Sequence, residues 1–282
     1  MLTLTNLRKS FGRTVAVDGL SLEIREGEVF GLLGPNGAGK STTINMIIGL
    51  LEPDSGVVDV QGFGRPDSPA TRARIGVAPQ SLALYDELSA RENLIFFGGM
   101  YGMSGAGLQS RADELLEAVG LTDRAGDRVK GFSGGMKRRL NIAVALVHDP
   151  PILLLDEPTV GVDPQSRNAI LETVRTLGAG GRTIIYTTHY MEEAQRLCDR
   201  VAIMDHGRLL ALGTVEQLLA QHGGESVVRI ERAQGEERIR TGEPLQEITR
   251  ALAEEHAVLA VHIDRPNIET VFLNLTGRSL RD

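Results

Sequence analysis

The chain has 282 residues, a formal charge of -7 and a sequence pI of about 5.5. This acidic balance argues against a general affinity for nucleic acid or anionic lipid, because such binding needs a basic face. Its one cysteine, Cys198, excludes an internal disulfide and a multi-cysteine metal site. The length suits one large core plus a smaller second unit.

The N-terminus, MLTLTNLRKSFG, alternates apolar and polar residues where a signal peptide would need an unbroken apolar core. No later segment approaches the roughly 18 apolar residues of a membrane-spanning helix. We therefore expect a cytoplasmic protein, in which any membrane role runs through a protein partner.

Short runs of alternating apolar and polar residues between Leu2 and Leu33 predict a β-rich opening. The last run, VFGLL, is almost continuously apolar, as is typical of a strand buried on both faces. It leads into a glycine-rich loop and then a predicted helix from Lys40 to Leu51, which ends near Pro53.

The glycine-rich loop reads GPNGAGKST and fits the pattern G-x-x-x-x-G-K-[ST] in full. Gly34, Gly37 and Gly39 let backbone N–H groups wrap a phosphate, and the helix that follows points its positive end at it. Lys40 and Ser41 can reach the β- and γ-phosphates and Mg²⁺. The order of strand, loop and helix thus predicts a phosphate-binding site.

The middle of the chain predicts an α/β core with a helical insert. Strands are expected at 74–80, 152–156 and 183–189, a helical region at about 87–148, a helix in PQSRNAILETVRTL, and a hairpin formed by RVAIMD and RLLALG.

Three of these strands end in polar residues that are candidates for catalysis. The strand ILLLD ends in Asp156 and is followed by Glu157, and strand alternation turns the two carboxylates to different sides. We interpret Asp156 as the metal partner and Glu157 as the general base. His189 and Gln80 end strands at the same carboxyl edge, where open parallel sheets bind ligands. His189 can contact a phosphate there, and Gln80 can hydrogen-bond a metal ion or water.

A second glycine-containing stretch, GFSGGMKRRL, follows almost a hundred residues after the first loop. Ser133 is a good N-cap for a helix over 134–147, whose start offers N–H groups, a positive dipole end and the cations of Lys137 to Arg139 to an anion. A capped amphipathic helix with a solvated basic face would also explain the cap and the charges, but not the pair of glycines.

The pattern changes near residues 221–224. From Ser226 the expected order is strand VVRIE, strand ERIRT, helix PLQEITRALAEEH, strand VLAVHID and helix IETVFLNLT, a compact α+β unit. We expect a first domain over residues 1–220 and an accessory domain over 223–282.

These motifs, in this order, resemble the nucleotide-binding subunits of ATP-binding cassette (ABC) transporters. The resemblance covers residues 1–220 and rests on the P-loop at 34–42, Gln80 of the Q-loop, the signature FSGGM, the Walker B strand ILLLDEP, the D-loop GVDP and the switch histidine His189. The tail RPNIETVFLNLTGRSLRD is similar to the accessory domain of exporters typified by daunorubicin-resistance ATPases.

The resemblance implies an α/β P-loop NTPase fold with a helical subdomain and a small C-terminal α+β domain. It also implies ATP and Mg²⁺ as ligands, with the metal held by Ser41, Gln80 and Asp156, and catalysis by Glu157, His189 and Gln80. The nucleotide would contact Phe11, Gly34, Asn36, Gly37, Ala38, Gly39, Lys40, Ser41, Thr42, Ser133, Gly134, Gly135 and Asp163.

Two positions depart from the pattern of the family. Met136 stands where the signature most often has Gln, and the serine and glycines expected to touch phosphate remain. Phe11 stands where the family usually carries a Tyr that stacks on adenine, and Phe keeps the aromatic face. In the family, the start of the signature helix faces the γ-phosphate on the P-loop of another subunit, so two chains in head-to-tail orientation enclose two ATP molecules.

The function implied is ATP hydrolysis that drives export of a drug, lipid or polysaccharide-like substrate. The expected partners are a second ATPase subunit, in a homodimer or heterodimer, and a separate multi-span permease that holds the chain at the inner face of the membrane; no nucleic acid is expected. The alternative is a nucleotide-switched soluble assembly or regulatory ATPase without a transport partner.

Overall fold

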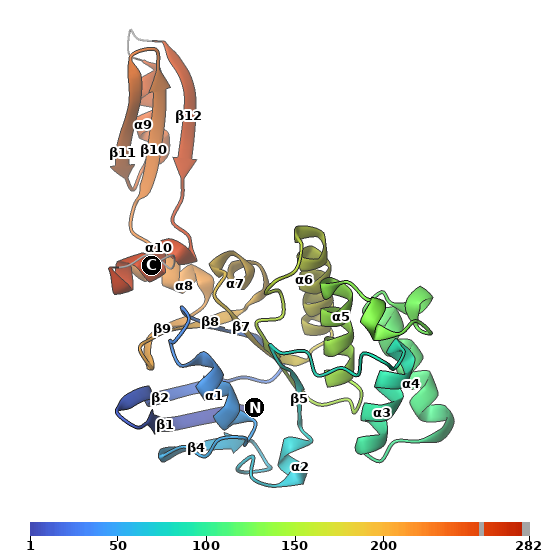
Figure 1. The fold of residues 1–282 in the computed structure, drawn as a ribbon. Coiled ribbons are helices and arrows are strands. Elements are labelled where there is room, and N and C mark those ends of the chain that lie inside the picture. The colour runs from blue at the N-terminus through green and yellow to red at the C-terminus, as the bar shows by residue number, and fades with distance from the viewer. Residues whose placement is uncertain (254–256, 278–282) are drawn as a thin grey trace. The chain divides into compact units, whose positions relative to one another are not determined.

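The computed structural model describes residues 1–253 and 257–277 and divides into two compact units, Met1–Leu212 and Gly213–Asp282 (Figure 1). We predicted the division between residues 220 and 223. It falls earlier, because helix α8 (Val215–His222) packs against helix α10 (Ile268–Thr276) and therefore groups with the C-terminal unit. Asn274 Nδ2 fastens the two helices by donating to the backbone oxygen of His222 at 2.8 Å.

The first unit contains the predicted α/β fold, built on two sheets. One is antiparallel, in the order β2-β1-β4, with β1 at Leu2–Phe11, β2 at Thr14–Ile24 and β4 at Ser55–Val60. The other has the order β5-β6-β7-β3-β8-β9, and its first five strands pair in parallel. The six strands of this sheet are β3 (Val29–Leu33), β5 (Ile75–Ala78), β6 (Ile152–Asp156), β7 (Thr183–Thr188), β8 (Arg200–Asp205) and β9 (Arg208–Gly213).

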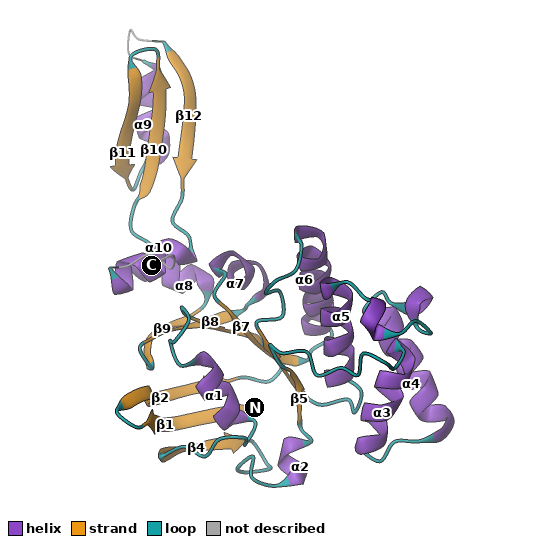
Figure 2. Ribbon diagram, viewed as in Figure 1, coloured by secondary structure: helices purple, strands orange, loops and turns teal. Residues whose placement is uncertain are grey.

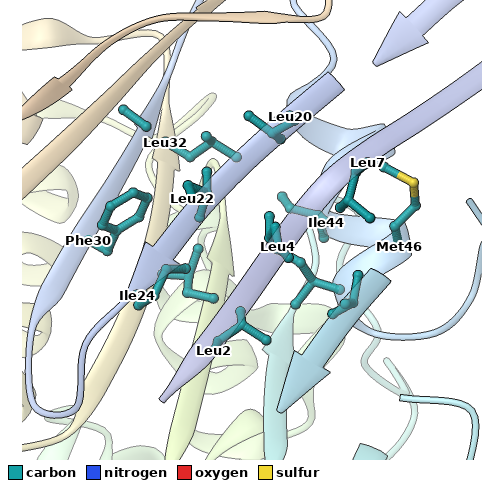
Figure 3. Close-up of a cluster of buried hydrophobic side chains, with 14 of the residues drawn as sticks. Leu2, Leu4, Leu7, Leu20, Leu22, Ile24, Phe30, Leu32, Ile44 and Met46 are labelled. Atoms are coloured by element: carbon teal, nitrogen blue, oxygen red, sulfur yellow. The ribbon is translucent and has the colours of Figure 1, made fainter. Parts of the chain in front are cut away.

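A hydrophobic core joins the two sheets to helix α1 (Lys40–Ile47). Figure 3 shows leucine side chains of β1 and β2 meeting Phe30 and Leu32 of β3 and Ile44 and Met46 of α1. Leu2, Phe30 and the other members of this cluster are almost completely buried, and each large side chain buried in this way stabilises the fold by about 1.5–3 kcal/mol. The packing fixes α1, and with it the glycine-rich loop, against the sheets.

Helices α3 (Ala90–Met100), α4 (Gly105–Ala118) and α5 (Gly134–Ala145) pack against one another, with short 3₁₀ turns at Thr122–Arg124 and Val129–Gly131 (Figure 2). They occupy the region predicted to be helical. Helix α3 begins at a capping box, in which Ser89 Oγ accepts from Glu92 N and Glu92 Oε2 accepts from Ser89 N. Helix α6 (Pro164–Ala179) links strand β6 to strand β7, as the sequence predicted.

Several short elements were not predicted. Strand β4 and helices α2 (Pro69–Arg72), α7 (Met191–Leu197) and α8 are too short for a clear period, and helix α1 ends at Ile47 rather than Leu51. Gly49 has a φ of +71°, a conformation that breaks a helix, and this explains the earlier end.

The C-terminal unit carries the predicted order of strands and helices. Its sheet has the order β11-β10-β12, from β10 (Ser226–Arg232), β11 (Gly235–Thr241) and β12 (Val258–Asp264), and α9 (Pro244–Leu252) packs on it around Val228, Ile230 and Ala251. The predicted end of α9, at residues 254–256, and the tail from 278 to 282 lie outside the described residues. Across the part of the chain that the structure describes, no helix has the length and apolar character needed to cross a membrane.

The end of α5 leads to a histidine with no hydrogen-bond partner. The ring of His148 stacks on that of Tyr101 at 3.7 Å between centroids, and neither of its nitrogen atoms has a partner among the described residues. Burial lowers the pKa of His148 from 6.5 to about 4, so the neutral form is favoured in the folded protein.

This lowered pKa predicts an acid sensitivity. Between pH 6.5 and pH 4 the unfolded chain binds a proton at His148 and the folded chain does not, so stability falls as the pH is lowered through this window. In His148→Phe the stacking remains and the titration is gone, while the carboxylates titrate as before. Calorimetric unfolding across this window should show a smaller loss of stability in His148→Phe than in the wild type; equal losses would contradict the assignment.

Candidate functional site

The glycine-rich loop joins the carboxyl end of the central strand β3 to the start of α1. Two of its glycines are required by close approaches of the backbone. A Cβ atom at Gly34 would lie 2.4 Å from the backbone oxygen of Met204, and one at Gly39, where φ is +100°, would lie 2.4 Å from that of Ala16. The loop thus needs glycine at both positions to lie against its neighbours, with its N–H groups at the start of a helix.

Lys40 is buried inside this loop, with only 5% of its surface exposed. Its Nζ atom donates to the backbone oxygens of Gly34 at 2.7 Å and Pro35 at 3.2 Å, and lies 3.3 Å from Oε1 of Glu157. The ammonium group therefore joins the loop to the residue that follows strand β6.

Glu157 is where four of the predicted residues meet. Besides the contact of Oε1 with Lys40, its Oε2 accepts from Nε2 of Gln80 at 3.4 Å and lies 3.3 Å from Nδ1 of His189. Strands β5, β6 and β7 are adjacent and parallel, so their carboxyl ends, which carry Gln80, Glu157 and His189, lie at one edge. Glu157 has a φ of +46°, and an unfavourable backbone of this kind is concentrated at functional sites.

Asp156 and Glu157 are tied together by Thr187 of β7, which we did not predict. The Thr187 hydroxyl donates to Asp156 Oδ1 at 2.7 Å and accepts from Glu157 N at 2.9 Å. Burial raises the pKa of the Asp156 carboxyl, and the hydrogen bond from Thr187 opposes this rise. The signal available in the sequence was the polar pair Thr187-Thr188 in an otherwise apolar strand.

A cavity of about 420 Å³ opens beside these groups. Phe11, Gln80 and Glu157 line it together with much of the loop, namely Pro35, Asn36, Gly37, Gly39, Lys40, Ser41 and Thr42. Phe11 is 53% exposed, which is unusual for an aromatic side chain that has a purely structural role. Thr14, Val15, Ala16 and His206 complete the lining and were not among the predicted residues.

Other predicted residues lie elsewhere. The described lining of the cavity does not include eight of the predicted residues, namely Gly34, Ala38, Ser133, Gly134, Gly135, Asp156, Asp163 and His189. Ser133 caps α5 by accepting from Met136 N at 3.2 Å, and Asp163 caps α6 by accepting from Ser166 N at 2.9 Å.

One signature glycine has a reason within the chain itself. A Cβ atom at Gly135 would lie 2.1 Å from Ser166 Oγ, so this glycine allows α5 and α6 to pack closely. Gly134 has no such neighbour, since a Cβ atom there would lie 4.0 Å from the nearest contact, the backbone oxygen of Gly161. The packing of the chain therefore explains only one of the two glycines.

We expected the three cations after the signature to face an anion. In the structure each of them contacts acceptors within the chain. Lys137 pairs with Asp86 at 2.8 Å, and Arg139 Nη1 donates to the backbone oxygen of Val119 at 2.7 Å. Arg138 Nη1 donates to the backbone oxygen of Gln80 at 2.5 Å. Each cation thus has at least one partner within the chain, and Arg138 attaches α5 to the loop that carries Gln80.

Comparison with known proteins decides the family. The family model described as ABC transporter matches residues 17–160. The linearmycin resistance ATP-binding protein LnrL of Bacillus subtilis is 46% identical to the chain and is aligned over the full length of both proteins. The chain belongs to the ABC transporter family.

Further relatives agree that it is an ATP-binding subunit of this family. The Nod factor export ATP-binding protein I of Ralstonia nicotianae is 42% identical over 100% of this chain and 95% of its own length. A solved structure of an ATP-binding subunit of an ABC transporter is 34% identical, with a TM-score of 0.71 over 79% of this chain and 93% of that one. A dimeric post-hydrolysis cassette bound to ADP and Pi is 29% identical, with a TM-score of 0.68 over 76% of this chain and 98% of that one.

The exposed ring of Phe11 in the cavity leads to a first prediction for this ABC subunit. Phe11→Ala should weaken ATP binding by about 1–3 kcal/mol, the value of one base stacked on an aromatic ring. Turnover at saturating ATP should change little. Calorimetric titration with ATP measures the effect, with Phe63→Ala as the matched control, since Phe63 is similarly exposed, at 45%, but does not line the cavity. Equal affinities of Phe11→Ala and wild type would remove Phe11 from the nucleotide site.

Proposed function

We propose that this chain hydrolyses ATP at sites shared between two ATPase subunits and thereby energises export through a separate membrane permease. The observation that carries the proposal is the convergence of Lys40, Gln80 and His189 on the carboxylate of Glu157, at the wall of a cavity that Phe11 also lines.

The cavity lining suggests how ATP binds. The triphosphate lies along the loop from Gly34 to Thr42, where N–H groups, the start of α1 and the ammonium group of Lys40 offset its charge. The adenine stacks on Phe11 at the other end. In this orientation the γ-phosphate lies near Glu157, whose side chain is 8% exposed and therefore largely shielded from bulk water.

Glu157 acts as the general base. It orients a water molecule for in-line attack on the γ-phosphorus and accepts its proton as the new P–O bond forms and the bond to the β-phosphate oxygen breaks. His189 and Gln80, both within 3.4 Å of Oε2, orient the carboxylate and the attacked phosphate. Lys40 offsets the negative charge that develops on the leaving oxygen.

The chain's donor set fits Mg²⁺. No cluster of three or more His, Cys, Asp or Glu side chains exists in the described ranges, whereas Asp156 supplies a carboxylate, Ser41 a hydroxyl and Gln80 an amide. One carboxylate supplemented by phosphate and water is the environment that Mg²⁺ prefers. Thr187 holds one oxygen of Asp156, which leaves the other available. Bound there, the metal would neutralise phosphate charge.

The signature residues complete the site from a second chain. Ser133, Gly134 and Gly135 begin a helix of twelve residues and do not line the cavity of the described chain. The N–H groups at the start of this helix can bind a phosphate on another subunit, and the packing of the chain leaves space around Gly134. The relative solved as a dimer with ADP and Pi supports two subunits per assembly.

Export is proposed from the relatives. The names of two relatives aligned over the whole chain refer to linearmycin resistance and Nod factor export. We infer that this chain works at the inner face of the membrane, attached to a multi-span permease that selects the substrate, and that Asp163 of the D-loop lies at the contact between the two ATPase subunits.

The role of Glu157 leads to a prediction on turnover. Glu157→Gln removes the base and should lower the rate of ATP hydrolysis by about 10²- to 10⁴-fold. Nucleotide binding should survive, so the variant should accumulate as a dimer in ATP and Mg²⁺. Phosphate release and light scattering measure the two effects. Unchanged turnover in a monomeric variant would remove Glu157 from the role of base.

The shared site leads to a prediction on mixed dimers. Lys40→Ala disables the loop half of a site and Ser133→Arg the signature half, so each homodimer should be inactive. A mixed dimer retains one site with both halves intact and should regain part of the activity. Subunit exchange is followed by light scattering and activity by phosphate release. Mixed dimers without activity would mean that the sites do not act in trans or that both must be intact, and disulfide trapping across the interface separates those cases.

A further inference from the structure

A second buried carboxylate lies behind the candidate site. Glu193, on α7, has no exposed surface, and its carboxylate accepts four hydrogen bonds. Oε1 accepts from Thr159 Oγ1 at 2.7 Å and Arg167 Nε at 2.7 Å, whereas Oε2 accepts from Tyr186 Oη at 2.9 Å and Thr188 Oγ1 at 2.8 Å. A charge buried this completely is tolerated only when it is paired and fully hydrogen-bonded.

The four donors come from segments that carry the proposed catalytic groups. Thr159 follows Glu157 by two residues. Arg167 lies in the first turns of α6, the helix that Asp163 caps, and its backbone N donates to the oxygen of Asp163 at 2.9 Å. Tyr186 and Thr188 belong to β7, which leads directly to His189. One carboxylate thus holds three segments of the chain together, namely the turn after β6, the start of α6 and the end of β7.

One path from Glu193 to His189 runs through the hydroxyl of Thr188. Thr188 Oγ1 donates to Glu193 and accepts from the backbone N of Tyr190 at 2.9 Å. His189 lies between these two residues, so the hydrogen bond across it closes the turn that holds its ring. A carboxylate can only accept, which forces the Thr188 hydrogen toward Glu193 and leaves a lone pair for Tyr190.

The rings of Tyr190 and His189 form a second connection between Glu193 and this histidine. The guanidinium group of Arg167 lies 4.7 Å from the centre of the Tyr190 ring, which in turn packs at 4.2 Å on that of His189. Arg167 is itself held by Glu193. Burial, followed by the charge of Glu193, raises the pKa of Tyr186, so its hydroxyl stays protonated and continues to donate.

We infer that Glu193 is a positioning residue for hydrolysis, which fixes the ring of His189 against the carboxylate of Glu157 without touching the nucleotide. The inference rests on the proposed function, in which Glu157 and His189 act on the γ-phosphate. The carboxylate of Glu193 then maintains the 3.3 Å distance between His189 Nδ1 and Glu157 Oε2 by holding the turn that carries His189.

The decisive variant is Glu193→Gln. The amide fills the same space but can direct its oxygen to only one pair of donors, so either Thr188 and Tyr186 or Thr159 and Arg167 face an NH₂ group. A reacting group displaced by about 1 Å can lose 10²-fold in rate. We therefore expect kcat to fall by about 10²-fold, with KM for ATP unchanged, because the residues lining the cavity are not altered.

Glu28→Gln is the matched control. Glu28 is likewise buried, accepts from Arg25 N at 2.7 Å and pairs with Arg200 at 3.1 Å, but it lies before β3, at the end of the strand opposite the glycine-rich loop. This variant should lose thermal stability in the same way and keep kcat. Equal losses of kcat in the two variants would show that Glu193 acts through stability alone and would overturn the inference.

A spectrum tests the position of His189 without hydrolysis. The chain has six histidines, so the imidazole nitrogen resonances of His189 can be identified by their loss in His189→Gln. They should move in Glu193→Gln and stay in place in Glu28→Gln. Unmoved resonances with unchanged kcat would refute the inference even if Glu157→Gln has confirmed the base. If the wild type hydrolyses no ATP, the proposed function fails, and these resonances alone decide whether Glu193 positions the ring of His189.

A second variant covers the case in which Glu193→Gln does not fold. Thr188→Val keeps the shape of the side chain and removes the hydroxyl that connects Glu193 to the turn at His189. It should shift the same resonances and lower kcat. If Glu193→Gln folds, the loss in the double variant should be smaller than the product of the two single losses, because both variants break the hydrogen bond between Glu193 and Thr188. Multiplicative losses would show that the path through Thr188 is wrong.

Discussion

The contact between Lys40 and Glu157 is the interaction on which the rest of the site depends. Both side chains are almost buried, at 5% and 8% exposure, and each charge would be costly there without an opposite charge. Removing one partner of such a pair typically destabilises a protein by about 3–5 kcal/mol. The pair also joins the glycine-rich loop to strand β6, so the phosphate-binding and catalytic parts of the site are held together by charge.

Sheet topology makes that contact possible. Strand β3 lies between β7 and β8, and β7 pairs with β6, so the loop after β3 and the residues after β6 and β7 emerge at one edge. Strands β3 and β6 are apolar and buried, apart from Asp156 at the end of β6. Strand β7 differs, because its buried residues include Tyr186, Thr187 and Thr188, close to its carboxyl end. The polar residues are displaced to the strand ends, where the site forms.

The sheet topology also explains which parts of the site could be predicted from the sequence. Long buried strands and a complete phosphate motif fix the order of segments, so Lys40, Gln80, Glu157 and His189 could be placed at one edge. Thr187 and Glu193 were missed, because a threonine within a strand and a glutamate on a short helix become informative only when their partners are known. The boundary after residue 220 was placed too late for the same reason, since the pairing of α8 with α10 spans some fifty residues of sequence.

Glu157 and Glu193 show how differently one chain can treat two buried carboxylates. Around Glu193 the four contacts are short, from 2.7 to 2.9 Å, and all come from strong donors in good positions. Around Glu157 the three contacts to side chains lie at 3.3 to 3.4 Å, near the limit of a hydrogen bond. A base must exchange its partners for water and phosphate during a catalytic cycle. Long, weak contacts lower the free energy needed for that exchange. A residue that holds loops in place must not exchange its partners, and saturation of all its acceptor positions prevents it. The two patterns of contact therefore separate the group that takes part in the chemistry from the group that keeps it in position.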